Sequence, residues 1–254
     1  MLAGQVPTDN SWKIGQSDNA ITYKSSYGEL RIIKQPFHIE IFDANSHLLT
    51  RTQNIGDPAT FITPIPFSFV RRASDLNRRI AATFQLQHDE KLFGCGESFT
   101  RLNKRGQHVV VYARDGMGTQ NEYMYKPIPF FLSSNGYGMF VHTSAPVTFD
   151  FGKYYDAHNV IYSGDESLDL FIFLGEPKDI LSEYTALTGR SPVPPLWSFG
   201  FWMSRITYNS EEQVRQVAEQ LRAHRVPADV IHLDTGWFET DWRSDYQLLQ
   251  FAFS

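Results

Sequence analysis

The sequence is poor in several features that mark particular classes of protein. Cys95 is the only cysteine among 254 residues, which excludes an internal disulfide and a cysteine-based zinc site. No apolar run approaches the ~20 residues of a membrane-spanning helix. The first twelve residues, MLAGQVPTDNSW, lack a basic segment followed by an apolar one, so we expect no signal peptide and a cytoplasmic protein.

Positive charge is also scarce. Lys and Arg number 23 against 28 Asp and Glu, a formal net charge of −5, and the basic pairs at 71–72 and 78–79 are short. A surface that follows phosphates is therefore not expected, and we expect no nucleic-acid partner. The eight His are scattered without metal-ligand spacing. Gly94-x-Gly96 lacks the third glycine and the following helix of a dinucleotide loop, so we expect neither a metal nor a cofactor.

Aromatic residues are abundant, at 15% of the chain, with 20 Phe, 12 Tyr and 5 Trp. This abundance fits either the core of a β-sandwich or a surface that stacks on sugars. For any single ring, core filling is the default interpretation. Hydrophobic and charged residues make up 42% and 20% of the chain, which is ordinary for a globular protein.

The pattern from Ser11 to about Phe173 is that of short strands and turns. Runs rich in Val, Ile, Phe, Tyr and Thr alternate apolar with polar residues, as in Glu29-Leu30-Arg31-Ile32. Many short strands separated by regular turn residues predict an antiparallel β-sandwich. The strands are expected at 20–24, 28–34, 38–43, 81–87, 109–112, 138–142, 147–151 and 168–174.

The character of the chain changes after Gly175. Pro177 and the apolar spacing that follows predict a helix over 178–187, with Gly189 as its C-cap. Ser191–Pro195 (SPVPP) is Pro-rich and predicts a domain boundary. We therefore expect a sandwich over 1–175, a helical linker and Pro-rich bridge over 176–195, and a different domain over 196–254.

Beyond the bridge the hydrophobic period changes from two to 3.6. Residues 197–203 predict a buried strand, and Asn209 or Ser210 can cap a helix, with Glu212 or Gln213 completing a capping box. The helix then carries an apolar stripe at Val214, Val217, Ala218 and Leu221. Pro227 ends it, and 229–234 predict a second strand. A strand, helix and strand in this order predict parallel pairing with a right-handed crossover.

Five motifs together resemble glycoside hydrolase family 31, which includes α-glucosidases and α-xylosidases, and the α-xylosidase-like members most of all. In chain order they are FGCGESF at 93–99, RDG at 114–116, YKPIPF at 125–130, PPLWSFG at 194–200 and HLDTGWF at 232–238. The resemblance implies a mainly β fold, an antiparallel galactose-mutarotase-like β-sandwich followed by the first βαβ elements of an incomplete (β/α)8 barrel. It also implies a substrate that is an oligosaccharide or an α-glycoside.

The resemblance assigns candidate substrate-binding residues. Asp234 follows an apolar strand, where barrel enzymes carry their functional side chains, and by resemblance it holds the terminal sugar. Asp115 lies in a polar loop that is expected to reach over the barrel mouth. Trp237, with Phe238, can offer apolar surface to a sugar, and Tyr208 and Arg205 are expected at the rim. Glu97 is expected to support a tight turn.

The catalytic residues are not assigned. A retaining glycosidase uses two carboxyl groups about 5–5.5 Å apart, and the family resemblance places both aspartates on later barrel strands. Only 59 residues run from Leu196 to Ser254, so we expect this chain alone to be inactive. The last residues, 248–254 (LLQFAFS), depart from the family pattern, which suggests a truncated product. Its exposed barrel elements are then expected to be mobile or to self-associate.

Two alternative functions remain open at this point. The chain can be a stand-alone carbohydrate-binding β-sandwich module, whose site is an aromatic face of the sandwich. It can also be an aldose-epimerase-like enzyme, by analogy of fold alone. That reaction needs an acid–base pair on one concave face; His108, His142 and Glu122 are the residues available, and nothing in the sequence brings them together.

Overall fold

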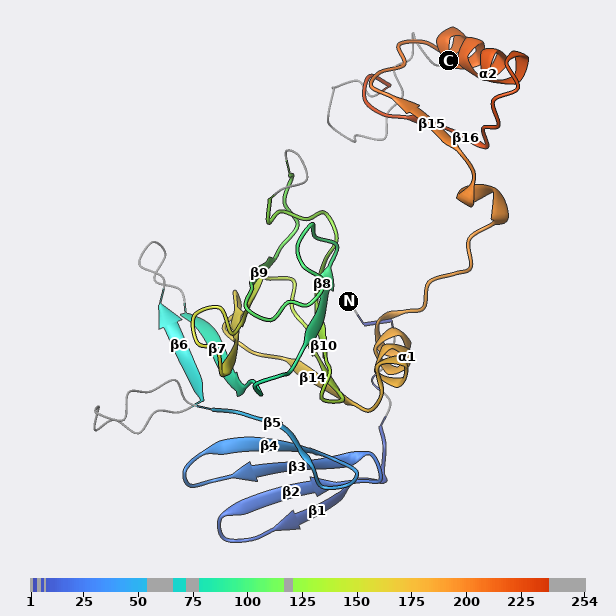
Figure 1. The fold of residues 1–254 in the computed structure, drawn as a ribbon. Helices are drawn as coiled ribbons and strands as arrows, with labels where there is room; N and C mark the ends of the chain where they lie inside the picture. Colours follow the sequence, from blue (N-terminus) through green and yellow to red (C-terminus); the bar gives the residue numbers. More distant parts are fainter. Residues whose placement is uncertain are drawn as a thin grey trace. The chain divides into compact units, whose positions relative to one another are not determined.

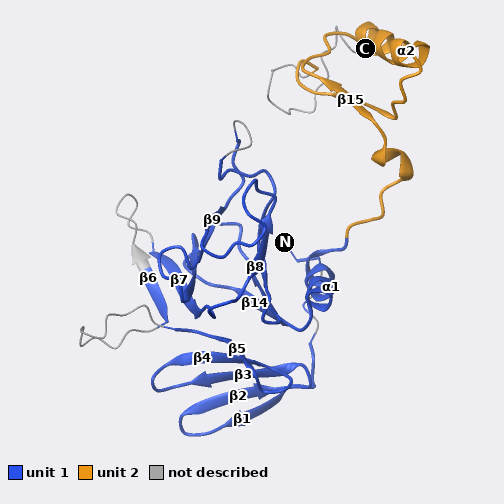
Figure 2. Cartoon of the chain, viewed as in Figure 1, with its two compact units in different colours: residues 1–190 blue, residues 191–254 orange. Residues whose placement is uncertain are grey.

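The structure is a computed structural model that describes residues 2–3, 6, 8–53, 66–71, 78–116 and 121–237. The chain divides into two compact units, Met1–Arg190 and Ser191–Ser254 (Figure 2). Each unit is described by itself below. Within the described residues, neither α-helix is long and apolar enough to cross a membrane.

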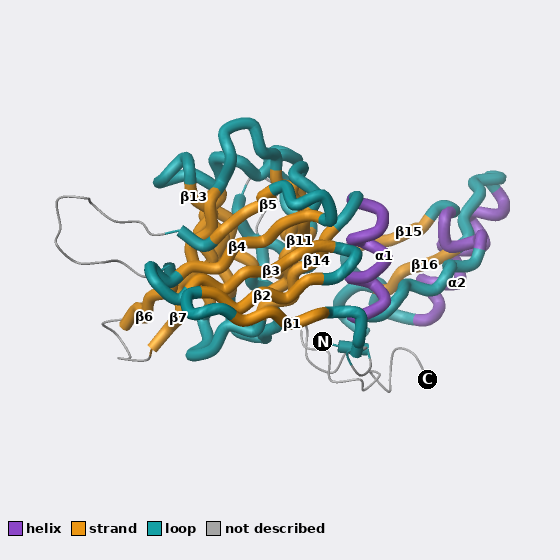
Figure 3. The backbone as a smooth tube through the Cα atoms, turned by 90° about the horizontal axis from the view of Figure 1, so that it is seen from below, coloured by secondary structure: helices purple, strands orange, loops and turns teal. Residues whose placement is uncertain are grey.

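The first unit begins with a five-stranded antiparallel sheet in which each strand pairs with the next one along the chain. Figure 3 shows these strands side by side. Residues of β4 and β5, among them Ile41 and Leu49, are buried in the main core of the unit. This sheet therefore contributes one wall of that core. Its strands are β1 (Lys13–Gln16), β2 (Ala20–Lys24), β3 (Gly28–Ile33), β4 (His38–Asp43) and β5 (Leu48–Arg51).

Two further antiparallel sheets form the β-sandwich (Figure 1). One has the order β14-β11-β10-β8 and the other the order β6-β7-β13-β12-β9. The first consists of β8 (Leu92–Gly96), β10 (Pro127–Ser133), β11 (Tyr137–Val141) and β14 (Leu170–Leu174). The second consists of β6 (Phe67–Arg71), β7 (Arg78–Gln85), β9 (His108–Val111), β12 (Val147–Phe151) and β13 (His158–Ser163). The antiparallel sandwich expected from the sequence is thus confirmed.

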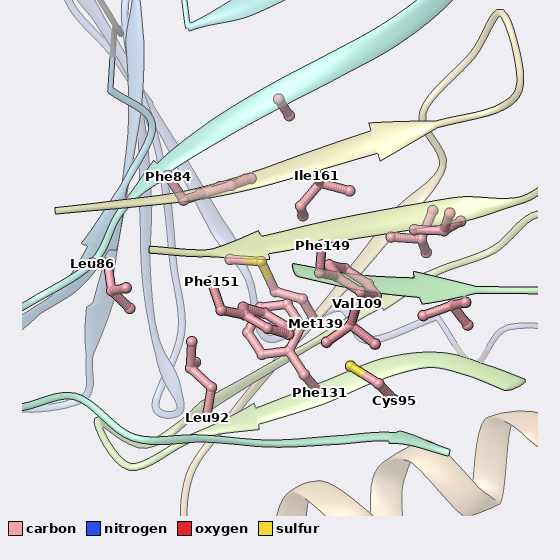
Figure 4. Close-up of a cluster of buried hydrophobic side chains, with 14 of the residues drawn as sticks. Phe84, Leu86, Leu92, Cys95, Val109, Phe131, Met139, Phe149, Phe151 and Ile161 are labelled. Carbon is pink, nitrogen blue, oxygen red and sulfur yellow. The ribbon is translucent and has the colours of Figure 1, made fainter. Parts of the chain in front are cut away.

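The core of the sandwich is rich in aromatic rings (Figure 4). Phe149 and Phe151 lie two residues apart on β12, and their rings stack with centroids 5.2 Å apart. Phe131 of β10 presents its edge to both, at 5.4 and 5.2 Å. Cys95 is buried beside them. The alternation along β12 places every second residue in this core, as a period of two requires.

Helix α1 (Pro177–Thr188) closes the first unit. It begins with Pro177 at its first position and ends at Gly189, whose φ of 107° suits a residue without a side chain. Ile180 and Leu187 are buried against aromatic residues of β10, β11 and β14. The ring of Tyr184 stacks on Phe130 with centroids 4.1 Å apart. The sequence predicted this helix over 178–187, and the structure places it within the first unit.

The second unit contains a 3-10 turn η1 (Leu196–Phe199), β15 (Trp202–Arg205), α2 (Glu211–Ala223) and β16 (Val230–Leu233). The two strands are parallel, with Trp202 opposite Val230 and Arg205 opposite Leu233. The expected strand–helix–strand order is confirmed.

The prediction of a buried strand over 197–203 was wrong in most of its length and in its burial, because the strand begins only at Trp202, and Phe201 and Trp202 are exposed. Residues 196–199 form a 3-10 turn, and Trp197 and Phe199 are exposed. The physical reason is local. Both the backbone NH of Ser198, at 3.0 Å, and its hydroxyl, at 2.7 Å, donate to the Pro195 carbonyl. A side chain that bonds its own neighbouring backbone competes with strand pairing.

Helix α2 begins as its sequence predicts. The Ser210 hydroxyl accepts a hydrogen bond from the backbone NH of Gln213 at 3.3 Å. The Gln213 side-chain oxygen reaches back to the NH of Asn209 at 2.9 Å, so both predicted capping residues take part. No residue of this helix is fully buried. Its apolar stripe at Val214, Val217 and Leu221 is only half-buried.

Candidate functional site

The candidate site of the second unit lies where its two parallel strands end. Arg205 and Leu233 are partners in the register, so the segments that follow them leave the same edge of the sheet. Functional side chains of parallel α/β folds gather at this carboxyl edge. Four of the residues predicted from the sequence, Arg205, Tyr208, Asp234 and Trp237, lie on β15, on β16 or within four residues of their ends.

Arg205 and Tyr208 form one contact at this edge. The guanidinium carbon of Arg205 lies 4.8 Å from the centroid of the Tyr208 ring, within the range of a cation–π interaction. Arg205 is exposed, whereas Tyr208 is 1% exposed. The Tyr208 hydroxyl is buried and has no hydrogen-bond partner among the described residues. The Tyr208 ring therefore supports the Arg205 guanidinium. Direct contact of Tyr208 with a sugar stays a prediction.

Asp234 opens the segment after β16. It is half-buried, Thr235 behind it is buried, and Trp237 is half-buried. Gly236 has a φ of +84°, and a Cβ atom there would lie 2.2 Å from the side-chain methyl of Thr207. Only glycine permits this approach. The segment after β16 thus lies directly on the segment after β15, which fixes the backbone that carries Asp234.

The role of Gly236 is something that the sequence reasoning missed. The glycine was recognised as part of a motif, but its partner Thr207 lies 29 positions earlier in the chain. A second contact between the strands was also missed, because the hydroxyl of Ser204 lies 3.1 Å from Nδ1 of His232. Both contacts depend on the register of β15 and β16. No local pattern reports that register.

Asp115 belongs to the first unit and is exposed. The segment that carries it is attached to residues 121–125. The NH of Arg114 donates to the Met124 carbonyl at 3.1 Å, and its guanidinium lies 4.1 Å from the Tyr123 ring centroid. The NH of Gly116 donates to the hydroxyl of Tyr125 at 3.3 Å. The loop base is therefore well defined, while the approach of Asp115 and Asp234 to one concavity stays a prediction.

Glu97 has a structural environment. Its carboxylate pairs with Lys126 at 3.0 Å, and both side chains are largely exposed. Gly96 before it has a φ of +90°, and a Cβ atom there would lie 2.0 Å from the Lys126 carbonyl. The Gly-Cys-Gly-Glu motif thus lets β8 approach β10 closely. These contacts agree with the turn-supporting role expected for Glu97.

The residues available for an epimerase-like reaction each have a different neighbour. His108 of β9 contacts the ring of Tyr154 edge-on at 5.7 Å. His142, after β11 in the other sheet, lies with Nδ1 2.8 Å from the Asp169 carboxylate, and Glu122 is exposed. No acid–base pair is formed from them. Across the described residues there is also no cluster of His, Cys, Asp or Glu that would hold a metal ion.

Several residues named from the sequence lie outside the described part of the chain. These are Phe238 and the divergent end at 248–254.

Comparison with known proteins gives two family matches that follow the division into units. Residues 2–150 match the glycosyl hydrolase 31 N-terminal galactose mutarotase-like domain. Residues 191–254 match the TIM-barrel domain of glycosyl hydrolases family 31.

Individual relatives agree with these matches. The α-xylosidase XylQ of Lactiplantibacillus pentosus is 44% identical over 217 residues, which cover 83% of this chain and 27% of the relative. An α-xylosidase of Emericella nidulans is 38% identical over 176 residues, 68% of this chain and 22% of the relative. The chain thus spans about a quarter of their length.

A solved structure shows the same fold. The family 31 dextranase of Flavobacterium johnsoniae, crystallised as a mutant with isomaltotriose, is 27% identical, with a TM-score of 0.78 over 96% of this chain and 28% of its own. The first family match alone covers more than half of the chain. The chain therefore belongs to glycoside hydrolase family 31, of which it contains the N-terminal sandwich and the start of the barrel domain.

Proposed function

We propose that this chain is the sugar-binding front part of a retaining α-glycosidase that removes terminal α-linked xylose or glucose. The observation that carries the proposal is the position of Asp234. It stands at the carboxyl end of β16, in a segment that Gly236 brings directly onto the segment after β15. The similarity of the chain to two α-xylosidases, at 44% and 38% identity, supports the choice of an α-linked sugar.

The residues at this edge have the chemistry that a sugar requires. The Asp234 carboxylate accepts hydrogen bonds from vicinal hydroxyl groups, and a charged acceptor makes the stronger kind. Arg205 donates, and stacking on the Tyr208 ring holds its guanidinium in place. Trp237 offers an apolar ring to the C–H face of the sugar. Asp115 is the second carboxylate that we assign to the same sugar.

We expect this chain to bind a sugar without hydrolysing it. Retention of configuration requires a nucleophile and an acid/base, two carboxyl groups about 5–5.5 Å apart. The family resemblance places both on barrel strands after β16. The substrate-binding carboxylate Asp234 does not replace either of them, because it is assigned to hydroxyl groups and not to the glycosidic bond.

The test is a titration of the purified chain with methyl α-D-xylopyranoside and methyl α-D-glucopyranoside, followed by NMR of the tryptophan indole groups. Asp234→Asn should weaken binding about tenfold or more, because a hydrogen bond to a charged group is worth ~1.5–3 kcal/mol. Asp229→Asn is the matched control. Asp229 lies just before the opposite, amino-terminal end of β16, packed against Gly200, and its replacement should leave binding unchanged.

Two results would contradict the proposal. An equal loss in both variants would show that Asp234 acts only on folding, and an absence of binding to either glycoside would remove the site. Release of an aryl group from an aryl α-xyloside, abolished by Asp234→Ala, would instead refute the expected lack of hydrolysis.

The stand-alone carbohydrate-binding module is the second candidate function. It is favoured by three exposed tyrosines of the first unit, Tyr154, Tyr155 and Tyr162.

A further inference from the structure

The sheet β6-β7-β13-β12-β9 has an outer face, opposite to the aromatic core. Phe149 and Phe151 of β12 point into the core, so Thr148 and Asp150 point outward. Tyr162 of β13 is the register partner of Thr148 and shares this outer face. Tyr162 is 39% exposed, so the sheet is open at this point.

The turn after β12 adds two more tyrosines to this face. Tyr154 is 67% exposed and its ring stands edge-on to His108 at 5.7 Å. Tyr155 is 51% exposed and its ring stands edge-on to His158 at 6.0 Å. His108 and His158 are register partners of the outward residue Asp150 and of Gln85 respectively. We call Tyr154, Tyr155 and Tyr162 the tyrosine platform.

The turn that carries the platform is fixed by hydrogen bonds, two of them to a buried carboxylate. The Asp150 carboxylate, 2% exposed, accepts hydrogen bonds from the NH groups of Lys153 at 2.7 Å and Tyr154 at 3.4 Å. The NH of His158 donates to the Tyr155 carbonyl at 2.9 Å. Arg105 donates to the Asp156 carbonyl at 3.0 Å. A surface held in this way loses little conformational entropy when a ligand binds.

A hollow continues the platform at Tyr162. It has a volume of about 340 Å³, and its lining includes Arg79, Thr148, Tyr162 and Gly164. Thr148 brings a hydroxyl that both donates and accepts, and Arg79 brings a guanidinium group. Flat rings beside a small polar hollow suit a ligand with apolar faces and hydroxyl edges. A sugar ring has both.

The charges around the platform indicate which class of ligand it suits. Burial raises the pKa of Tyr162, and the negative charge of Asp150 raises it further. The Tyr162 hydroxyl, like that of an ordinary tyrosine, is neutral at physiological pH. Asp156, Asp165 and Glu166 lie in the adjoining turns, and the cations Arg79, Arg105 and Lys153 lie beside them. Charges of both signs give this surface no strong field of one sign, which suits a neutral ligand.

We propose that the tyrosine platform and its hollow form a second carbohydrate-binding site, which holds a neutral oligosaccharide or polysaccharide chain by stacking. The site belongs wholly to the first unit and uses no residue of the edge that carries Asp234. It extends the second candidate function, the carbohydrate-binding module, by assigning the sheet face and the tyrosine rings that bind. It does not depend on the assignment of Asp234, and the two sites are separable by mutation.

Affinity electrophoresis of the purified chain tests the proposal, with dextran and xyloglucan as the two polysaccharide probes in native gels. We expect the chain to be retarded by at least one of them. Tyr154→Ala and Tyr155→Ala should each raise the dissociation constant by roughly two- to tenfold, which corresponds to the loss of one stacked ring. Tyr154→Phe, which keeps the ring, should bind as the original chain does. An unchanged near-UV circular dichroism spectrum checks that each variant is folded.

Tyr27→Ala is the matched control, because Tyr27 is 63% exposed beside β3 of a different sheet. Retardation that survives both platform variants, or that Tyr27→Ala reduces equally, overturns the proposal. So does an absence of retardation with both polysaccharides. Retardation lost only in Asp234→Asn assigns the binding to the edge of β15 and β16, which refutes the platform and leaves the proposed function standing. A platform variant that changes the sedimentation of the chain without sugar identifies a protein interface and also refutes it.

Discussion

A buried carboxylate beside β10 and β11 allows a quantitative test of the fold. Glu90 is 1% exposed and precedes β8. One of its oxygens, Oε1, accepts hydrogen bonds from the hydroxyl groups of Ser133 and Tyr137, the latter at 2.6 Å. The other accepts from the NH of Gln87 at 3.0 Å. Burial, together with the charge of Glu90, raises the pKa of Tyr137 well above its ordinary value, so this hydroxyl remains a donor.

Tyr137→Phe removes one of these three donors and keeps the ring that fills the core. A hydrogen bond to a charged group contributes about 1.5–3 kcal/mol. No cavity term is added, because only an oxygen atom is lost. We therefore expect the free energy of unfolding of the first unit to fall by about 1.5–3 kcal/mol. Ser133→Ala should cost a similar amount, and the two losses should not add, since both donors bind the same oxygen.

Urea unfolding followed by near-UV circular dichroism of tyrosine is the suitable assay. Four of the five tryptophans, Trp197, Trp202, Trp237 and Trp242, belong to the second unit, so tryptophan fluorescence would mainly report on that unit. Tyr162→Phe is the control, because Tyr162 is 39% exposed and loss of its hydroxyl should cost less than ~0.5 kcal/mol. A change below that value for Tyr137→Phe, or an equal change in the control, would refute the argument from burial.

Two further predictions concern pH and the second unit. Burial raises the pKa of the Cys95 thiol to about 12. The unfolded thiol loses its proton near ~8.5, so stability should fall as the pH rises above that value, up to about 12, with a slope of up to ~1.4 kcal/mol per pH unit. Cys95→Ala should flatten this decline, and an identical decline would assign it to other groups. Amides of Val214–Leu221 should exchange faster than those of β11, because no residue of α2 is fully buried; equal protection in a demonstrated monomer would contradict this.

The sequence predicted the strands whose side chains alternate cleanly. The ranges 20–24, 38–43 and 147–151 match β2, β4 and β12 residue for residue. The list of expected strands lacked β1, β5, β6, β8, β10 and β13. Of these, β8 and β10 have a composition that resembles that of turns. β8 contains Gly94 and Gly96, and β10 contains Pro127 and Pro129. Pairing between them, with a register shift between Pro127 and Phe131, makes strands of segments with low strand propensity.

The candidate site was predictable only where it depends on local sequence. Ser210 as a helix cap and Asp234 at a strand end both follow from residues within a few positions. The burial of Tyr208 beneath Arg205, and the contact of Gly236 with Thr207, depend on how two strands far apart in sequence align. The 3-10 turn at 196–199 was missed for the opposite reason. It combines backbone hydrogen bonds with one from the Ser198 hydroxyl, and the apolar pattern of the segment hides both.

The tyrosine platform shows the same limit for a binding surface. The alternation along a strand predicts that Thr148 and Asp150 face away from Phe149 and Phe151. It does not predict whether other residues cover that outer face. The answer comes from the turn after β12, which folds back onto Asp150 and exposes its two tyrosines. A strand-end site and a sheet-face site thus arise from different backbone features, one from register and one from a turn. Because they share no residue, loss of Asp234 should leave stacking on the sandwich intact, and loss of Tyr154 should leave the edge of β15 and β16 intact.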